Sequence, residues 1–187
     1  MNTIALLVMD VQRGIVDRYA QDAGYLARLR RAVDAARTAD IRIIYVTVRF
    51  RPGYPEVSPR NKSFATLSQT TAFSEGDPAT AIHPDVTPAP GDILVTKRRV
   101  SAFAGSDLDV VLRAANIDTL VLTGIATSGV VLSTLRQAAD LDYRLVVLAD
   151  ACLDGDAEVH RVLTEKVFPR QAEVLTVDRW VEQLNAR

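Results

Sequence analysis

The stretch DTLVLTGIATSGVVLST, residues 118–134, joins an apolar run to a glycine and then to a helical pattern. Residues 118–123 are almost all apolar or β-branched, which is typical of a strand covered on both faces of a parallel sheet. Gly124 ends that strand, and Thr127 or Ser128 could cap the helix that follows. Backbone N–H groups at such a helix start point into the crevice beyond the sheet, where they can form an anion or oxyanion site.

The same alternation of strand and helix runs through the chain. Five further apolar or β-branched runs lie at 3–9, 41–48, 93–96, 144–149 and 172–177. Helical patterns lie between or after them, at 26–36, 108–115, 127–141, 156–167 and 178–185, with Ser106 or Asp107 placed to cap the second. Strands that alternate with helices imply right-handed crossovers and a doubly wound sheet. We therefore predict an α/β fold with a six-stranded parallel sheet, in one domain that covers residues 1–187.

One segment interrupts this alternation. Residues 50–92 contain seven of the eight prolines, together with several aromatic and basic side chains. Connections of this length are uncommon inside a compact domain and usually form a lid, a binding loop or an interface. We expect a short helix near 62–69, and either a wall over a pocket or a contact between subunits.

Composition narrows the classes of partner. Hydrophobic residues make up 48% of the 187 residues, charged residues 24%, and the formal net charge is -1. A near-neutral chain lacks the clustered basic face that nucleic acids and anionic membranes need, so we expect neither partner. The single cysteine, Cys152, excludes an internal disulfide and fits a reducing cytoplasm. We expect a small-molecule substrate, no cofactor and no metal.

Two charged residues follow strands at the carboxyl edge, where open α/β sheets bind ligands. Asp10 comes directly after the first apolar run, and its desolvation raises its pKa unless a cation lies near, which makes it a candidate acid or base. Lys97 follows the third run and could supply that cation. Gln12 and Phe103 lie close to them in sequence and are candidates for substrate contact.

Three motifs in order carry a resemblance to a known family. LLVMDVQ at 6–12, KRRVSAF at 97–103 and GIATSGVVLST at 124–134 resemble the isochorismatase-like family, also called the cysteine hydrolase superfamily. The likeness extends from Ile4 to about Val177. It implies a six-stranded parallel sheet flanked by helices, which often assembles into homodimers or larger homo-oligomers. It also implies a catalytic aspartate, lysine and cysteine.

The sequence departs from the family at the cysteine. The resemblance places the aspartate at Asp10, the lysine at Lys97 and the cysteine at Val130, which is not reactive. It also implies a cis peptide bond between Ile125 and Ala126. The substrate-binding candidates at this junction are Ala126, Thr127, Ser128 and Gly129. The histidine-rich metal segment of nicotinamidase-type members is not seen, and structural roles are expected for His83 and His160.

Three hypotheses follow from this departure. The first is a hydrolase without a thiol, similar to isochorismatases proper, which have glycine at the cysteine position; there Asp10 would be the acid and Lys97 its electrostatic partner. The second is a displaced nucleophile at Thr127, Ser128 or Cys152. The third is a catalytically inactive member that binds a ligand or acts as an oligomeric interaction protein.

Overall fold

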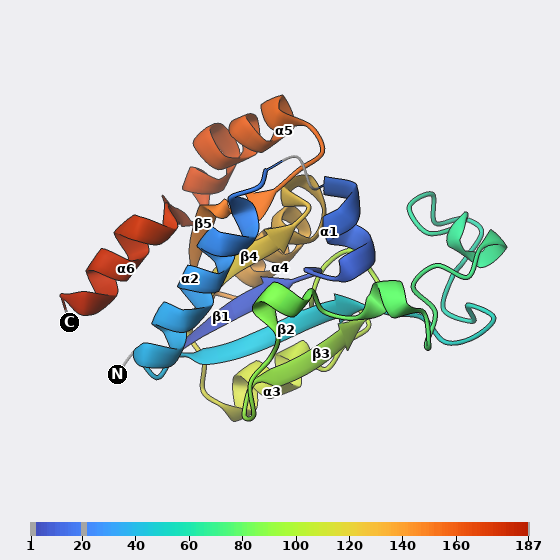
Figure 1. The fold of residues 1–187 in the computed structure, drawn as a ribbon, viewed down its shortest axis with the longest axis horizontal. Coiled ribbons are helices and arrows are strands. Elements are labelled where there is room, and N and C mark those ends of the chain that lie inside the picture. The colour runs from blue at the N-terminus through green and yellow to red at the C-terminus, as the bar shows by residue number, and fades with distance from the viewer. Residues whose placement is uncertain (1–2, 20–21, 187) are drawn as a thin grey trace.

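A six-stranded parallel sheet forms the centre of the molecule (Figure 1). The computed structural model describes residues 3–19 and 22–186. The strands are β1 (Ile4–Met9), β2 (Arg42–Val48), β3 (Ile93–Lys97), β4 (Thr119–Ile125), β5 (Arg144–Leu153) and β6 (Glu173–Leu175), and their order across the sheet is β3-β2-β1-β4-β5-β6. The predicted fold class is confirmed. The order in which strands are added to the sheet reverses between β1 and β4: β2 and β3 lie on one side of β1, and β4, β5 and β6 lie on the other. Folds of this kind bind ligands at such a switch point.

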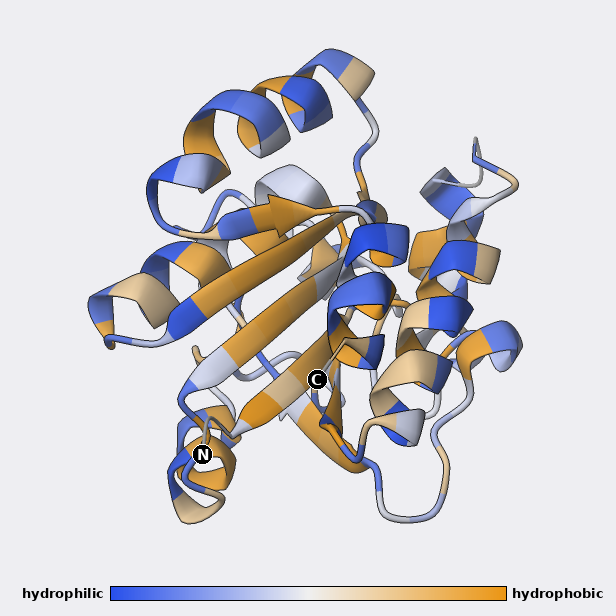
Figure 2. Cartoon of the chain, turned by 90° about the vertical axis from the view of Figure 1, so that its left-hand side faces the viewer, coloured by the Kyte–Doolittle hydropathy of each residue, from blue (hydrophilic) through white to orange (hydrophobic). Residues whose placement is uncertain are grey.

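Helices cover both faces of the sheet. One face packs against α1 (Arg13–Tyr19), α2 (Tyr25–Thr38) and α6 (Val177–Asn185), and the other against α3 (Leu108–Ala114) and α4 (Leu132–Asp140). Figure 2 shows orange, hydrophobic strands between helices whose outward surfaces are mostly blue. The apolar runs of the sequence therefore become strands that are buried on both sides. Within residues 3–19 and 22–186, no helix has the length and apolar character needed to cross a membrane.

Several element boundaries differ from the prediction. The short helix α1 was not predicted, because seven residues give little helical periodicity. The pattern at 127–141 divides into a π-helical turn, η4 (Thr127–Val131), and α4, while 156–167 divides into α5 (Ala157–Val162) and a second π-helical turn. Near 62–69 only the single turn Leu67–Gln69 is helical. The Ser106 hydroxyl, and not Asp107, caps α3 by accepting the Leu108 N–H at 3.2 Å.

The proline-rich segment projects from the body of the molecule between β2 and β3 (Figure 1). It has a small core of its own, in which Phe50 packs against Tyr54, Phe64 and Phe73. The returning chain is bound next to the residues that follow β1, since His83 N–H donates to the Val11 carbonyl and Arg13 N–H to the Ala81 carbonyl, each at 2.9 Å.

Gln12 joins the start of this segment to its returning chain. Its fully buried side-chain nitrogen Nε2 donates to the carbonyls of Val48 at 3.0 Å and Thr80 at 2.8 Å. Its oxygen Oε1 accepts the Val48 N–H at 2.9 Å. Val48 ends β2 and Thr80 belongs to the returning chain, so one amide links the start of the segment to the chain that returns from it.

Gly124 permits the close approach of β1 and β4 at the switch point. Its φ is +136°, and a Cβ atom there would lie 2.1 Å from the Met9 carbonyl oxygen. A side chain could therefore be accommodated only if the two central strands moved apart.

We expect Gly124→Ala to lower the free energy of unfolding by at least about 3 kcal/mol, because the clash with backbone cannot relax by side-chain rotation. Urea unfolding followed by circular dichroism measures this. Gly53→Ala is the matched control, since Gly53 has a φ of +77° but a Cβ atom there would have no neighbour within 4 Å. Equal losses for the two variants would contradict the packing explanation.

We expect Gln12→Leu to lower the free energy of unfolding by about 2–4 kcal/mol, because it leaves one backbone N–H and two carbonyls buried without partners. Gln183→Leu is the control, because the Gln183 side chain is exposed on α6 and makes one hydrogen bond, of 3.3 Å, to Glu173. Limited proteolysis of residues 50–80 should also become faster in Gln12→Leu alone. Unchanged stability would show that the Gln12 amide does not anchor the segment.

Candidate active site

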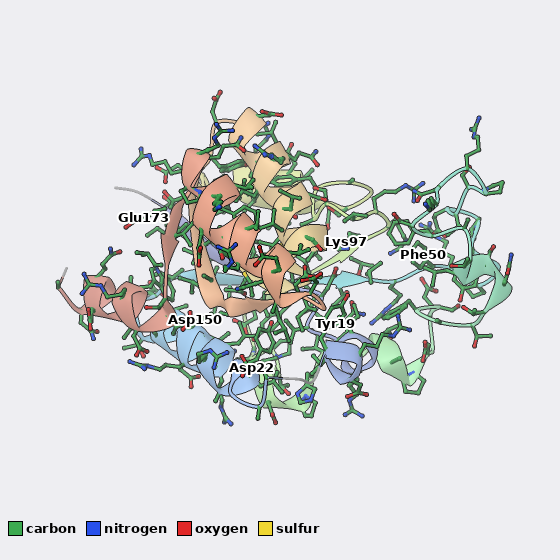
Figure 3. All side chains as sticks on the ribbon, turned by 90° about the horizontal axis from the view of Figure 1, so that it is seen from above. Tyr19, Asp22, Phe50, Lys97, Asp150 and Glu173 are labelled. Carbon is green, nitrogen blue, oxygen red and sulfur yellow. The ribbon has the colours of Figure 1, made fainter. Side chains whose placement is uncertain are left out.

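An ion pair between Asp10 and Lys97 occupies the carboxyl edge of the sheet. Lys97 Nζ lies 2.9 Å from Asp10 Oδ2, and the two residues are only 2% and 6% exposed. Lys97 ends β3, which is separated from β1 by β2, so its side chain reaches past the intervening strand to Asp10. The same ammonium donates to the Arg99 carbonyl at 2.9 Å. Figure 3 labels Lys97 beside Phe50, where the projecting segment begins, in agreement with the pairing of Lys97 with Val48.

Burial and a neighbouring cation act in opposite directions on the Asp10 carboxyl group. Burial raises the pKa of Asp10 above its ordinary value of 3.8, although the Lys97 ammonium lowers it. The second carboxylate oxygen, Oδ1, is buried and accepts no hydrogen bond from any residue that the structure describes. Asp10 also has a φ of +57°, a left-handed conformation that aspartate tolerates better than most residues. The group therefore has one oxygen held by a cation and one oxygen free.

Gln12 and Phe103 have different environments. The two N–H groups of the Gln12 amide are already donated to backbone carbonyls, so this side chain anchors the chain next to Asp10. Phe103 is buried in the hydrophobic core that also contains Met9, Val130 and Cys152. Phe103 and Val130 thus belong to the same hydrophobic core, on one face of the sheet.

The junction after β4 has the local geometry of a sharp strand-to-helix connection. The peptide bond between Ile125 and Ala126 is cis, and η4 begins directly afterwards at Thr127. Met9 and Gly124 are paired neighbours in β1 and β4, so Asp10 and Ile125 lie at the same level at the carboxyl edge of the sheet. Val130 lies within η4 and its side chain is buried.

The expected capping of this helix by Thr127 or Ser128 is wrong. The Thr127 hydroxyl Oγ1 is bonded instead to His160 Nδ1 at 2.8 Å, and the Ser128 N–H donates to Asp154 Oδ2 at 2.7 Å. Both partners come from the chain after β5, and they are too distant in sequence for a local pattern to predict these contacts. The Gly129 N–H donates to the Ala126 carbonyl at 3.0 Å, so two amides expected to bind an anion already have partners in the chain.

Cys152 has the environment of a structural thiol. It is buried, its Sγ lies 3.9 Å from the Leu122 carbonyl oxygen, and burial raises its pKa to about 12. A thiol with that pKa is almost entirely protonated at neutral pH and is a poor nucleophile. The geometry therefore disfavours Cys152 as a displaced nucleophile.

A cavity of about 380 Å³ opens beside the end of β5. Its charged and polar lining residues are Asp22, Arg28, Asp150, Cys152, Asp154 and His160. Arg28 forms ion pairs with both Asp22 and Asp150, and these two labelled carboxylates lie near each other in Figure 3. Within the described ranges, no three His, Cys, Asp or Glu side chains are grouped so that they could hold a metal ion.

Comparison with known proteins finds relatives that match nearly the whole chain. The chain is 34% identical to the ureidoacrylate amidohydrolase RutB of Stutzerimonas stutzeri, over 97% of this chain and 80% of that protein. It is also 34% identical to YwoC, an uncharacterized isochorismatase family protein of Bacillus subtilis, over 96% of this chain and 93% of that protein.

Solved structures show the same fold. An isochorismatase family protein from Burkholderia thailandensis superposes with a TM-score of 0.85 at 30% identity, over 98% of this chain and 96% of that one. A cysteine hydrolase from Pseudomonas syringae pv. phaseolicola gives a TM-score of 0.89 at 23% identity, with coverage of 98% and 92%. The family pattern of the isochorismatase domain matches residues 4–179. The chain therefore belongs to the isochorismatase family.

Proposed function

We propose that this chain is a hydrolase of a small molecule in which Asp10 and Lys97 perform acid–base chemistry and no cysteine nucleophile takes part. The observation that carries the proposal is the buried ion pair between Asp10 and Lys97. The Oδ1 atom of Asp10 has no hydrogen-bond partner among the described residues. A desolvated carboxyl group with a raised pKa is a good general acid, and the adjacent ammonium stabilises the carboxylate that remains after proton transfer.

For a vinyl ether substrate, the proton balance is simple. The Asp10 carboxyl group donates its proton to the terminal carbon of the double bond, which leaves an oxocarbenium ion. Water then forms a bond to the cationic carbon and returns a proton to Asp10. The resulting hemiketal breaks its carbon–oxygen bond to give a ketone or aldehyde and an alcohol, so the net reaction consumes one water. The Lys97 ammonium, 2.9 Å from Asp10 Oδ2, stabilises the carboxylate that remains after the proton is donated.

Amide hydrolysis is the other chemistry to assay, because several relatives are named ureidoacrylate amidohydrolase. A solved neighbour, at 23% identity, is an N-carbamoylsarcosine amidase from Thermoplasma acidophilum. Val130 has a hydrocarbon side chain and forms no covalent acyl intermediate. In this chain, water itself would have to attack the carbonyl carbon, with Asp10 as the base.

The competing proposal is an inactive family member that binds a ligand or takes part in an oligomer. The burial of Val130 in the hydrophobic core favours it, because the position of the family cysteine is filled with hydrocarbon. Turnover that depends on Asp10 would exclude this alternative.

The proposal also includes a cytoplasmic homodimer or larger homo-oligomer, with residues 50–92 as a lid or an interface. Two large apolar side chains support self-association: Leu94 on edge strand β3 is 60% exposed, and Val110 on α3 is 68% exposed. Apolar side chains on an open edge strand are typical of a surface that is covered in the assembled protein.

We expect Asp10→Asn to lower the kcat of whichever vinyl ether, amide or ester the wild type hydrolyses by at least about 100-fold, since an amide cannot transfer the proton. Steady-state kinetics on a substrate panel measures this. Asp178→Asn removes an equal charge from an exposed side chain of α6 that is paired with Arg31, and should leave kcat unchanged. Undiminished turnover by Asp10→Asn would contradict the acid–base mechanism.

We expect the pH profile of vinyl ether hydrolysis to report the pKa of Asp10. Activity that needs protonated Asp10 falls as the pH rises through its pKa, which burial raises above 3.8. Lys97→Met removes the cation that lowers this pKa, so the falling limb should move to higher pH. Lys97→Arg keeps a cation and should move it less. A limb that stays in place in Lys97→Met would show that another group titrates.

A further inference from the structure

The turn that carries Val130 is held by a carboxylate from another part of the chain. Asp154 lies in the loop between β5 and α5, and its Oδ2 atom accepts the Ser128 N–H at 2.7 Å. The other oxygen, Oδ1, accepts the Asp156 N–H at 3.3 Å. The neighbouring residue, Thr127, is held by His160 of α5. Two residues after β5 thus fix two consecutive residues after β4.

The start of a helical segment ordinarily favours an anion, because its N–H groups and its dipole present positive charge. Here the chain supplies that anion itself. A substrate carboxylate or a thiolate at the same turn would meet the fixed charge of Asp154 and would be repelled by it.

Among the described residues, no cationic side chain forms an ion pair with the Asp154 carboxylate. Arg28 lines the same cavity but pairs with Asp22 and Asp150. Burial lowers the pKa of His160, although Asp154 raises it, so the imidazole carries little charge at neutral pH. The cavity is therefore lined by three carboxylates and one guanidinium, and its net charge is negative.

We propose that Asp154 determines the specificity of the candidate active site: its carboxylate occupies the start of η4 and excludes anionic groups there. The part of the substrate that meets this turn is therefore neutral. This inference rests on the proposed function for its meaning in catalysis, but its electrostatic content does not need turnover. It also gives the valine a physical context, since a thiol at position 130 would have its reactive thiolate form disfavoured by Asp154.

A reporter thiol tests the electrostatic claim directly. Val130→Cys places a sulfur in η4, and the thiolate absorbance near 240 nm gives its pKa. The wild type is the baseline, because its one cysteine, Cys152, has a pKa raised to about 12. Adding Asp154→Asn or Asp154→Ala should lower the pKa of the introduced thiol by about one unit or more, since a negative charge is removed.

Asp178→Asn in the Val130→Cys background is the control for net charge. It removes the same charge from α6 and should shift the thiol pKa only slightly, because solvent and salt screen distant charges. If the Asp154 variants shift the thiol pKa no more than Asp178→Asn does, the proposal is overturned. Circular dichroism checks that each variant is folded.

Nuclear magnetic resonance of the backbone amides supplies a second measurement that needs no introduced thiol. Benzoate and inorganic phosphate serve as probe anions. In the wild type they should leave the amides of Ser128 and Val130 unmoved, while Asp154→Ala should gain a saturable response. Saturable binding of either anion at this turn in the wild type would overturn the proposal, whether or not a hydrolysable substrate is found.

Discussion

The buried pair of Asp10 and Lys97 imposes the strictest requirement on the rest of the structure. Removing one partner of such a pair typically costs about 3–5 kcal/mol, because the other charge stays buried alone. The pair can form only if β1, β2 and β3 keep their register, so that Lys97 reaches past β2. The Arg99 carbonyl and the amide of Gln12 then hold the surrounding chain in place. Much of the carboxyl edge of the sheet is arranged around this single contact.

The junction after β4, beside that pair, depends on close backbone packing. Gly124 lets β4 come close to the Met9 carbonyl, and β5 bulges where Leu122 pairs with Val147 but Gly124 pairs with Cys152. The bulge places Asp150 where its Oδ1 accepts the Val177 N–H of α6 at 2.8 Å. The following loop brings Asp154 and His160 to Thr127 and Ser128. Strand irregularities of this kind commonly redirect side chains near functional sites.

The fold was predictable from sequence because continuous apolar runs at regular spacing leave little choice but a parallel sheet covered on both faces. Asp10 and Lys97 were identifiable for a related reason: each directly follows such a run. The partners of Thr127 and Ser128 were not predictable, because Asp154 and His160 are distant in sequence and compete with local capping only after folding. The same holds for Gln12, whose buried amide binds backbone of a segment that carries no periodic pattern. Tertiary hydrogen bonds of this kind leave no local signature.

The anchoring of the proline-rich segment has a consequence for how this protein can diversify. Gln12 and the bonds from Arg13 and His83 hold the segment where it leaves β2 and where the chain returns at 80–83, while its outer part is supported by a separate small cluster around Phe50. Changes of length or sequence in the outer part can therefore accumulate without displacing Asp10. A new binding surface could evolve there while the chemistry of the sheet edge remains as it was.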